Sequence, residues 1–195
     1  MSCNKMEIKG SQTEKNLLKA FAGESQARNR YTFFAKAAKK EGYYQVARLF
    51  LETAEHERIH AKNFFRELPG GDLEITAKFP SGVIGTTEEN LKSSIAGEHE
   101  ENSFLYPEFA QVARNEGFED LARLFLSVVV VEKMHEKRFS KLLKRVDEDT
   151  VWKRDETVRW VCTKCGFTYE DKEPPGKCPC CKHPKEYFEV FVENY

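Results

Sequence analysis

The chain has 195 residues, 32% of them charged, yet its formal net charge at pH 7 is only −1. This length fits one medium-sized domain with a small appendage, and the balanced charge provides no long-range field to attract nucleic acid. No apolar run approaches the length of a membrane span, and the first residues, MSCNK, lack the apolar core of a signal peptide. We therefore expect a soluble cytoplasmic protein with no nucleic-acid or membrane partner.

Two long helices are predicted in the first third of the chain. A capping box, Ser11-x-x-Glu14, opens the first helix, and an apolar stripe follows until Gly42 stops it. The second helix is expected over about residues 44–68, where Pro69 and the two glycines behind it end the helix.

A long irregular connection over residues 69–87 precedes the third helix. Thr86-x-x-Glu89 is a second capping box, and the helix that it opens should stop near residue 117. Pro107 lies inside this helix and should kink or locally unwind it, because proline lacks a backbone N–H and clashes with the preceding turn.

A fourth helix, over about residues 118–146, completes a second hairpin. Two hairpins joined by one long crossover predict an all-α, ferritin-like four-helix bundle over residues 1–146. Residues 147–157 read as a polar linker. Residues 158–195 combine short β-rich pieces with five cysteines, and this part is too small for a sizeable core, so it should need a metal to fold.

The two hairpins share one sequence pattern. The string ARLFL at residues 47–51 recurs at residues 122–126, an offset of 75. The repeated ionisable residues are Glu57 with Glu132 and His60 with His135 at that offset, and Glu24 with Glu98 at an offset of 74. A duplicated helical pair that keeps ligand residues in both copies indicates a two-metal site.

Each Glu-x-x-His motif can direct two ligands to one point, because positions i and i+3 share a helix face. Two such motifs, with one Glu from each remaining helix, match the ligand set of ferritin-like di-iron and di-manganese proteins. Burying so many ionisable groups without a cation would cost roughly several kcal/mol per charge. Mixed carboxylate and imidazole ligands suit iron or manganese and do not exclude zinc.

The duplication is imperfect at one position. Glu101 follows Glu98 in the third helix, whereas the matching position of the first helix is Ala27. One metal could thus gain a carboxylate that the other lacks, so we expect unequal coordination and redox-dependent ligand movement.

The second helix also contains a zinc-protease signature, His56-Glu57-x-x-His60. The fourth helix repeats the glutamate and the second histidine but has Val131 in place of the first. Because the repeat preserves the glutamate with only one histidine, a protease is disfavoured, and His56 is expected to be solvated or to lie beside the ligands. His99 is expected to face away from the site.

The cysteines of the last part form two pairs, Cys162-x-x-Cys165 and Cys178-x-x-Cys181. Four thiolates around one ion make a tetrahedral site for zinc or a single iron, and a zinc ribbon stays open as an alternative. Cys180 could compete for the fourth position, but the matching spacing of the two pairs favours Cys181. The remaining thiols would then be those of Cys3 and Cys180.

In combination and order, these motifs closely resemble those of rubrerythrins along essentially the whole chain. The matching segments are residues 21–28 (FAGESQAR), Glu57-x-x-His60, Gly97-Glu98-x-x-Glu101, Glu132-x-x-His135 and the module from Cys162 to Cys181. The resemblance implies a non-haem di-iron centre in the bundle and an Fe(Cys)4 centre in a rubredoxin-like tail. It also implies hydrogen peroxide reduction as protection against oxidative stress, with electrons from NAD(P)H through a reductase or rubredoxin. The implied assembly is a head-to-tail homodimer or a higher oligomer.

The resemblance also assigns roles to residues. The implied di-iron ligands are Glu24, Glu57, His60, Glu98, Glu101, Glu132 and His135, and the four-cysteine ligands are Cys162, Cys165, Cys178 and Cys181. On reduction one iron would exchange Glu101 for His60. Tyr31 and Tyr106 match tyrosines that hydrogen-bond ligating carboxylates, with ordinary packing as the alternative. Two other functions stay open: a ferroxidase or iron-storage protein of ferritin type, and a redox-silent zinc protein.

Overall fold

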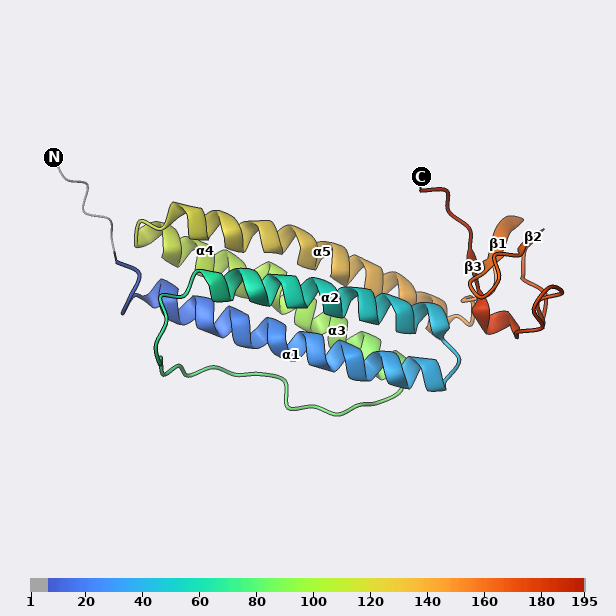
Figure 1. The fold of residues 1–195 in the computed structure, drawn as a ribbon, viewed down its shortest axis with the longest axis horizontal. Coiled ribbons are helices and arrows are strands. Elements are labelled where there is room, and N and C mark those ends of the chain that lie inside the picture. Colours follow the sequence, from blue (N-terminus) through green and yellow to red (C-terminus); the bar gives the residue numbers. More distant parts are fainter. Residues whose placement is uncertain (1–6, 195) are drawn as a thin grey trace.

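The computed structural model describes residues 7–194, which form a helical bundle followed by a small strand domain (Figure 1). The bundle consists of α1 (Gln12–Lys40), α2 (Tyr44–Arg66), α3 (Thr87–Glu100), the π-helical turn η1 (Glu101–Leu105), α4 (Tyr106–Asn115) and α5 (Glu119–Asp147). Helix α1 packs along α2, and α5 packs along α3 and α4. The predicted four-helix bundle is confirmed.

The connection between α2 and α3 is a long crossover. Residues 69–86 contain no helix or strand. In Figure 1 this segment runs along the outside of the bundle, back to the end where α1 meets α2, so α2 and α3 run in the same direction. This crossover distinguishes a ferritin-like bundle from a simple up-and-down one.

Both predicted capping boxes start helices. The Ser11 hydroxyl accepts from the N–H of Glu14 at 3.0 Å, and Thr86 and Glu89 exchange hydrogen bonds reciprocally. Gly42 adopts a φ of +89°, a left-handed conformation that favours glycine, and so allows the sharp turn between α1 and α2.

Two glutamates at matching positions of the repeat connect the two hairpins by hydrogen bonds. Glu116 accepts from the backbone N–H groups of Gln12 and Thr13 at the start of α1, at 3.0 and 2.8 Å. Glu41 occupies the matching position of the first copy and accepts from the N–H of Thr87, at the start of α3, at 3.0 Å. A carboxylate from each hairpin therefore caps the first helix of the other, where the helix dipole favours negative charge.

Pro107 changes the helix before it, as predicted. Helix α3 passes into η1, whose wider hydrogen bonding includes a bond from the Tyr106 N–H to the Glu101 carbonyl, and α4 then starts with Pro107 in its first turn. The π-helical turn explains why the repeat offset changes from 74 at Glu98 to 75 beyond it, because such a turn accommodates one extra residue.

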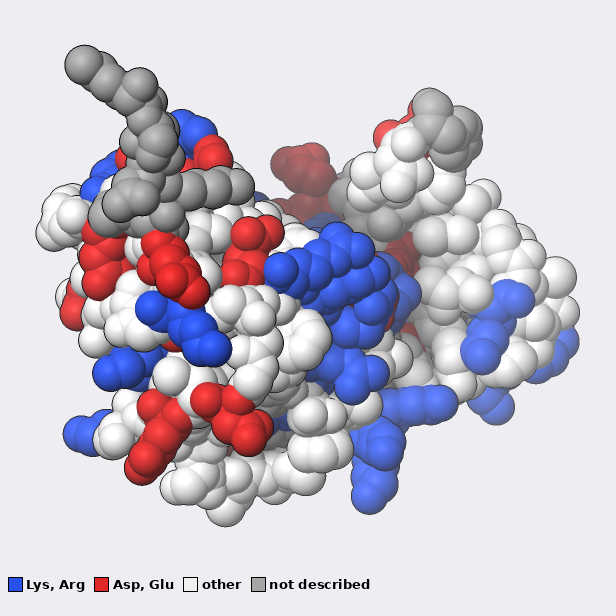
Figure 2. All heavy atoms as spheres, turned by 60° about the vertical axis from the view of Figure 1, so that its left-hand side comes forward, with Lys and Arg blue, Asp and Glu red and all other residues white. Residues whose placement is uncertain are grey.

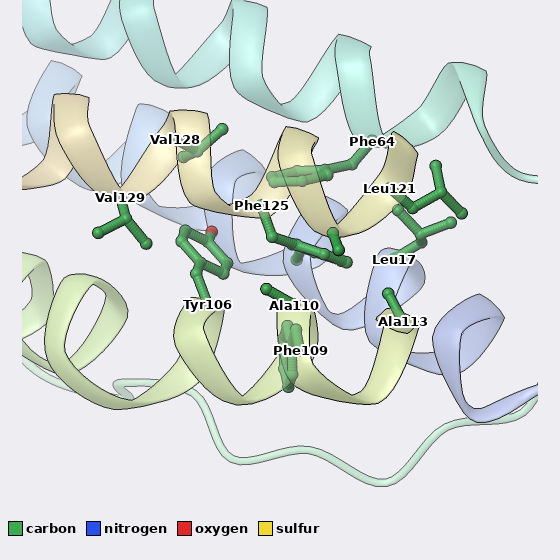
Figure 3. Packing of buried hydrophobic residues seen from close by; sticks show 12 residues of the cluster. Leu17, Phe64, Tyr106, Phe109, Ala110, Ala113, Leu121, Phe125, Val128 and Val129 are labelled. Carbon is green, nitrogen blue, oxygen red and sulfur yellow. The ribbon is translucent and has the colours of Figure 1, made fainter. Parts of the chain in front are cut away.

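The apolar core of the bundle is divided into two clusters. One cluster surrounds Phe64, Tyr106 and Phe125 and is drawn in Figure 3. The other surrounds Tyr31 and Phe50. Each tyrosine directs its hydroxyl to a buried carboxylate, so the two clusters flank the polar groups described below.

The strand domain is a three-stranded antiparallel sheet of order β2-β1-β3, formed by β1 (Val158–Cys162), β2 (Thr168–Asp171) and β3 (Phe188–Val190). A short 3₁₀ turn, η2 (Lys185–Tyr187), precedes β3. The buried core cluster of the strand domain has only four side chains, those of Trp160, Cys162, Cys178 and Phe188. A core of this size agrees with the predicted need for a metal.

This domain contacts the α1–α2 end of the bundle. The rings of Tyr44 and Tyr187 stack with centroids 4.1 Å apart, and Arg48 forms a two-pronged ion pair with Glu189, with Nη2 to Oε2 at 2.7 Å. In the left part of Figure 2 acidic and basic groups are mixed, whereas Lys and Arg side chains gather in the centre of the view. Within residues 7–194, no helix combines the length and apolarity needed to span a membrane.

Candidate metal centres

Six ionisable side chains from four helices meet inside the bundle. Glu24 comes from α1 and Glu98 from α3, while α2 and α5 each supply a Glu and a His one turn apart. The exposed fraction is 8% for His60 and at most 1% for the other five, which are Glu24, Glu57, Glu98, Glu132 and His135. The repeat therefore places all six predicted residues in one water-poor cluster.

The first half of the cluster surrounds His60. Its Nδ1 lies 2.9 Å from Oε2 of Glu57, 2.9 Å from Oε1 of Glu132 and 3.8 Å from Oε2 of Glu24. One donor atom from each of these four residues lies within 4.8 Å of the others, which is close enough for all four to hold one ion.

The second half repeats this arrangement around His135. Its Nδ1 lies 2.7 Å from Oε2 of Glu132, 3.2 Å from Oε1 of Glu57 and 3.5 Å from Oε2 of Glu98. Glu57 and Glu132 belong to both halves, and each presents one oxygen to each histidine. Glu57 and Glu132 could therefore each donate one oxygen to each of two cations.

The donor atoms themselves fit a pair of cations. Among the described residues, eleven buried side-chain nitrogen and oxygen atoms have no partner with hydrogen-bond geometry, and eight of them belong to this cluster. They are Oε2 of Glu24, both oxygens of Glu57 and of Glu132, Oε2 of Glu98 and Nδ1 of His60 and His135. Buried polar atoms are costly unless they are satisfied, and oxygen and imidazole donors suit iron or manganese.

The ionisable groups of the cluster shift one another's pKa values. Burial raises the pKa of Glu24 to about 8, assisted by the charge of Glu132. Burial would lower the pKa of His135, but its close polar contacts with Glu132, Glu57 and Glu98 outweigh this and raise it to about 12. Burial would raise the pKa of Glu132, yet its contacts with His135 and His60 lower it to about 2. The carboxylates thus stabilise a positively charged imidazolium at the centre of the cluster.

Two tyrosines orient the outer carboxylates. The Tyr31 hydroxyl donates to Oε1 of Glu98, and the Tyr106 hydroxyl donates to Oε1 of Glu24. Burial, followed by the charge of the adjacent glutamate, raises the pKa of both hydroxyls, so they remain protonated donors. In each glutamate the other oxygen, Oε2, is left facing the histidine of its half.

Glu101 lies at the edge of the cluster. It contributes no atom to either group of four, and its Oε1 lies 3.9 Å from the position that a Cβ on Gly23 would occupy. It lines a cavity of about 430 Å³, together with Tyr106 and the crossover residues Lys78 and Phe79. Burial and the charge of Glu24 raise its pKa, so Glu101 is electrostatically part of the site.

The other two histidines of the bundle belong to neither group of four. His56 contacts the cluster from outside, through a 3.0 Å hydrogen bond between its Nδ1 and Nε2 of His135. His99 is exposed and interacts with Glu136 at 3.1 Å.

A second site lies in the strand domain, where four sulfur atoms converge. Sγ of Cys162 is 3.7 Å from that of Cys181, and Sγ of Cys165 is 3.6 Å from that of Cys178, while Cys180 is exposed and outside the group. These separations match a tetrahedron with metal–sulfur bonds of about 2.3 Å, whose edges are about 3.8 Å. Cys3 lies outside the described residues.

Two similar turns hold the sulfur atoms. The N–H of Gly166 donates to the Cys162 carbonyl at 2.8 Å, and the N–H of Lys182 donates to the Cys178 carbonyl at 2.9 Å. Gly166 and Lys182 both have positive φ, of +76° and +64°. Burial would raise the pKa of Cys178, but backbone N–H groups, including that of Cys181, lower it to about 7 and so favour the thiolate.

Comparison with known proteins agrees with both sites. The rubrerythrin family model matches residues 15–143, and the model of the rubredoxin-like domain of rubrerythrin matches residues 160–189. The rubrerythrin of Porphyromonas gingivalis is 55% identical over 188 residues, which cover 96% of this chain and 94% of that protein.

Solved structures share the fold. A fully reduced, all-ferrous nigerythrin is 34% identical, with a TM-score of 0.62 over 98% of this chain and 92% of that one. A bacterioferritin of Desulfovibrio desulfuricans with a diiron site is 22% identical, with a TM-score of 0.61 over 71% of this chain and 82% of that one, and it shows the fold alone. A two-iron site in a ferritin-like bundle and a four-cysteine rubredoxin-like site follow from these matches and from the geometry.

Proposed function

This chain belongs to the rubrerythrin family, and on that premise we propose that it reduces hydrogen peroxide to water with electrons that pass through its four-cysteine site. One observation carries the proposal: the same chain contains a buried two-metal donor set, joined by two shared carboxylates, and a separate four-thiolate site. The first suits a two-electron reaction, and the second suits the transfer of single electrons.

The residues that would hold the metals follow from the two groups of four. Two irons would be held by Glu24, Glu57, His60, Glu98, Glu132 and His135, with Glu101 as a further ligand, and a third iron by Cys162, Cys165, Cys178 and Cys181. When bound, the iron pair supplies the two electrons that hydrogen peroxide takes up with two protons as it becomes two molecules of water.

The surrounding side chains keep the donor set in place. Tyr31 and Tyr106 hold Glu98 and Glu24 by one oxygen each, which leaves the other oxygen directed into the site. The flanking apolar clusters exclude water, so the electrostatic attraction between the carboxylates and cations is strong.

The cavity beside Glu101 is the proposed approach for peroxide. Its volume of about 430 Å³ admits a molecule of this size, and the Glu101 carboxyl can deliver a proton there. We expect Glu101 and His60 to alternate as ligands of the metal next to Glu24. In support of this, His60 lies inside the first group of four while Glu101 lies at its edge.

Electrons would reach the bundle from the four-cysteine site of a partner subunit. Helix α5 continues for 12 residues beyond His135, or about 18 Å at 1.5 Å per residue, before the strand domain starts. A head-to-tail homodimer would bring the partner's strand domain closer. NAD(P)H, through a reductase or rubredoxin, would supply the electrons.

The test is anaerobic stopped-flow on fully reduced, iron-loaded protein, following the visible absorption of the four-cysteine iron. We expect fast oxidation by hydrogen peroxide, much slower oxidation by oxygen, and loss of the fast phase in Glu101→Ala. Glu108→Ala, which removes another carboxylate of the same cavity, is the matched control and should react normally.

Two outcomes would contradict the proposal. If peroxide leaves the four-cysteine iron reduced, the two sites are not connected. If excess ferrous iron and oxygen produce a mineral core, the protein is a ferroxidase of ferritin type.

A further inference from the structure

His56 links α2 to α5 at the outer edge of the two-metal site. Its Nδ1 lies 3.0 Å from Nε2 of His135, and the two rings stack with centroids 5.2 Å apart and an interplanar angle of 11°. When Nδ1 of His135, which faces the carboxylates, binds a cation, the ring proton of His135 is on Nε2 and can be donated to Nδ1 of His56. His56 therefore constrains both the tautomer and the ring orientation of His135.

The repeat does not provide the same support for His60. At the offset of 75 that relates His60 to His135, the counterpart of His56 is Val131, which has no polar side-chain atom. The residue at this position of the repeat is thus a hydrogen-bonding histidine in the first copy and an apolar valine in the second.

The two halves of the site also differ in their number of carboxylates. The half with the anchored His135 has Ala27 at the position that matches Glu101. The half with His60 has the additional carboxylate of Glu101 beside Glu24. The half around His135 therefore has a histidine held by a second hydrogen bond and no additional carboxylate. The half around His60 lacks that hydrogen bond but has the additional carboxylate of Glu101.

We propose that His56 is a positioning residue that keeps His135 on its metal, and that the pairing of His56 with Val131 decides which histidine can leave. The inference rests on the ligand exchange in the proposed function and assigns its direction to particular residues. Hydrogen bonds to the second nitrogen of a metal-bound histidine fix its orientation, and their removal lowers metal affinity by about 10- to 100-fold.

Cobalt(II) titration of the full-length, metal-stripped chain tests the anchor. We expect His56→Leu to weaken binding of one bundle cobalt by about 10- to 100-fold, whereas His56→Gln keeps an acceptor and restores most of the affinity. His99→Leu is the matched control, because it removes an exposed bundle histidine outside the donor set. Cobalt bound in the four-cysteine site gives a separate absorption from its thiolate ligands. An unchanged absorption in the variants shows that this site still folds.

Proton NMR of the cobalt-loaded chain tests the direction. We expect one paramagnetically shifted imidazole N–H, that of His135, to exchange slowly with water in the native chain and in His56→Gln, and to exchange fast in His56→Leu. Val131→His should produce a second slowly exchanging N–H, because it would give the imidazole of His60 a hydrogen-bond partner.

The inference is overturned if His56→Leu binds cobalt like the native chain, if His56→Gln is as weak as His56→Leu, or if the slowly exchanging N–H survives in His56→Leu. No peroxide is used in either experiment. A failure here therefore leaves the peroxidase proposal untouched, and a failed peroxidase assay does not change the cobalt and NMR results on His56.

Discussion

Tyr106 illustrates how a single hydroxyl keeps a buried carboxylate in position. It donates to Oε1 of Glu24, and both side chains are at most 2% exposed. In Tyr106→Phe, Oε1 would lose its donor in a site that water does not reach. An unsatisfied buried acceptor costs about 1–3 kcal/mol, so the free energy of unfolding of the iron-loaded chain should fall by that amount in urea titrations.

Tyr43→Phe is the control for this change. It removes a hydroxyl from a half-buried ring that stacks on Trp152, away from the cluster. If both variants lose the same stability, the Tyr106 hydroxyl has no special role in holding Glu24.

The metal-free bundle should become less stable as the pH rises from 6.5 to 8. The folded pKa of His135, about 12, lies above its ordinary 6.5, so its contribution is complete below 6.5 and is lost as the pH rises. Glu24 acts in the same direction, because its folded pKa of about 8 lies above the ordinary 4.5 and the folded chain keeps a proton that the unfolded chain releases.

Urea titration of the chelator-treated chain, followed by helical circular dichroism, measures this dependence. The midpoint should fall between pH 6.5 and 8, and iron loading should remove the fall because the metals replace the protons. A midpoint that rises over this range without metal would show that the carboxylates are not protonated in the folded state.

At the scale of elements, η1 places two residues of the site. Tyr31 follows Glu24 by seven residues in α1, whereas Tyr106 follows Glu98 by eight, and η1 accommodates the difference. Both tyrosines consequently reach a carboxylate of the opposite hairpin. Glu101, the first residue of η1, lies at the edge of the cluster, and π-helical turns of this kind are frequent at functional sites.

Deletion of Phe104 tests the role of this turn. Phe104 is 63% exposed, so its side chain contributes little to the core, but its removal would convert η1 into regular α-helix. Pro107 would then lie inside an α-helix, which costs about 3 kcal/mol, and the thermal midpoint should drop. Pro107→Ala in the shortened chain should recover the loss; no recovery would mean that Pro107 is not the cause.

At the scale of the whole molecule, the two metal sites are in separate domains. The strand domain contacts the bundle through few groups, among them the pair of the exposed Arg48 and the partly buried Glu189. Since the domain follows the far end of α5, a partner subunit is the proposed source of electrons for the bundle.

Subunit mixing distinguishes delivery between subunits from delivery within one. Cys178→Ala removes the four-cysteine site, and Glu132→Ala removes a shared carboxylate of the bundle site. Each variant alone should be inactive in peroxide turnover. After the variants are unfolded together and refolded with iron, mixed dimers should restore about a quarter of native turnover, because half of the dimers are mixed and one of their two pathways is complete.

The controls are each variant refolded alone, and a mixture of the two that has not been unfolded. If the refolded mixture stays inactive although mixed dimers are present, electrons travel within a single subunit.

Local sequence signals were sufficient to predict the helices, the crossover and the residue types that gather in the two candidate metal sites. Capping boxes and glycine stops act on adjacent residues, and the offset of 75 relates ligands on different helices without knowledge of their distance. The same offset relates Glu41 to Glu116, so the reciprocal helix caps could have been found from it.

Only the folded chain shows that Glu57 and Glu132 each face both histidines, that Glu101 lies at the edge of the site, and that His56 contacts His135. These features depend on the distances between helices and on side-chain orientations. Both are set by the packing of the apolar clusters on either side of the site. A sequence pattern places a residue on a helix face, but the neighbouring helix decides what that residue meets.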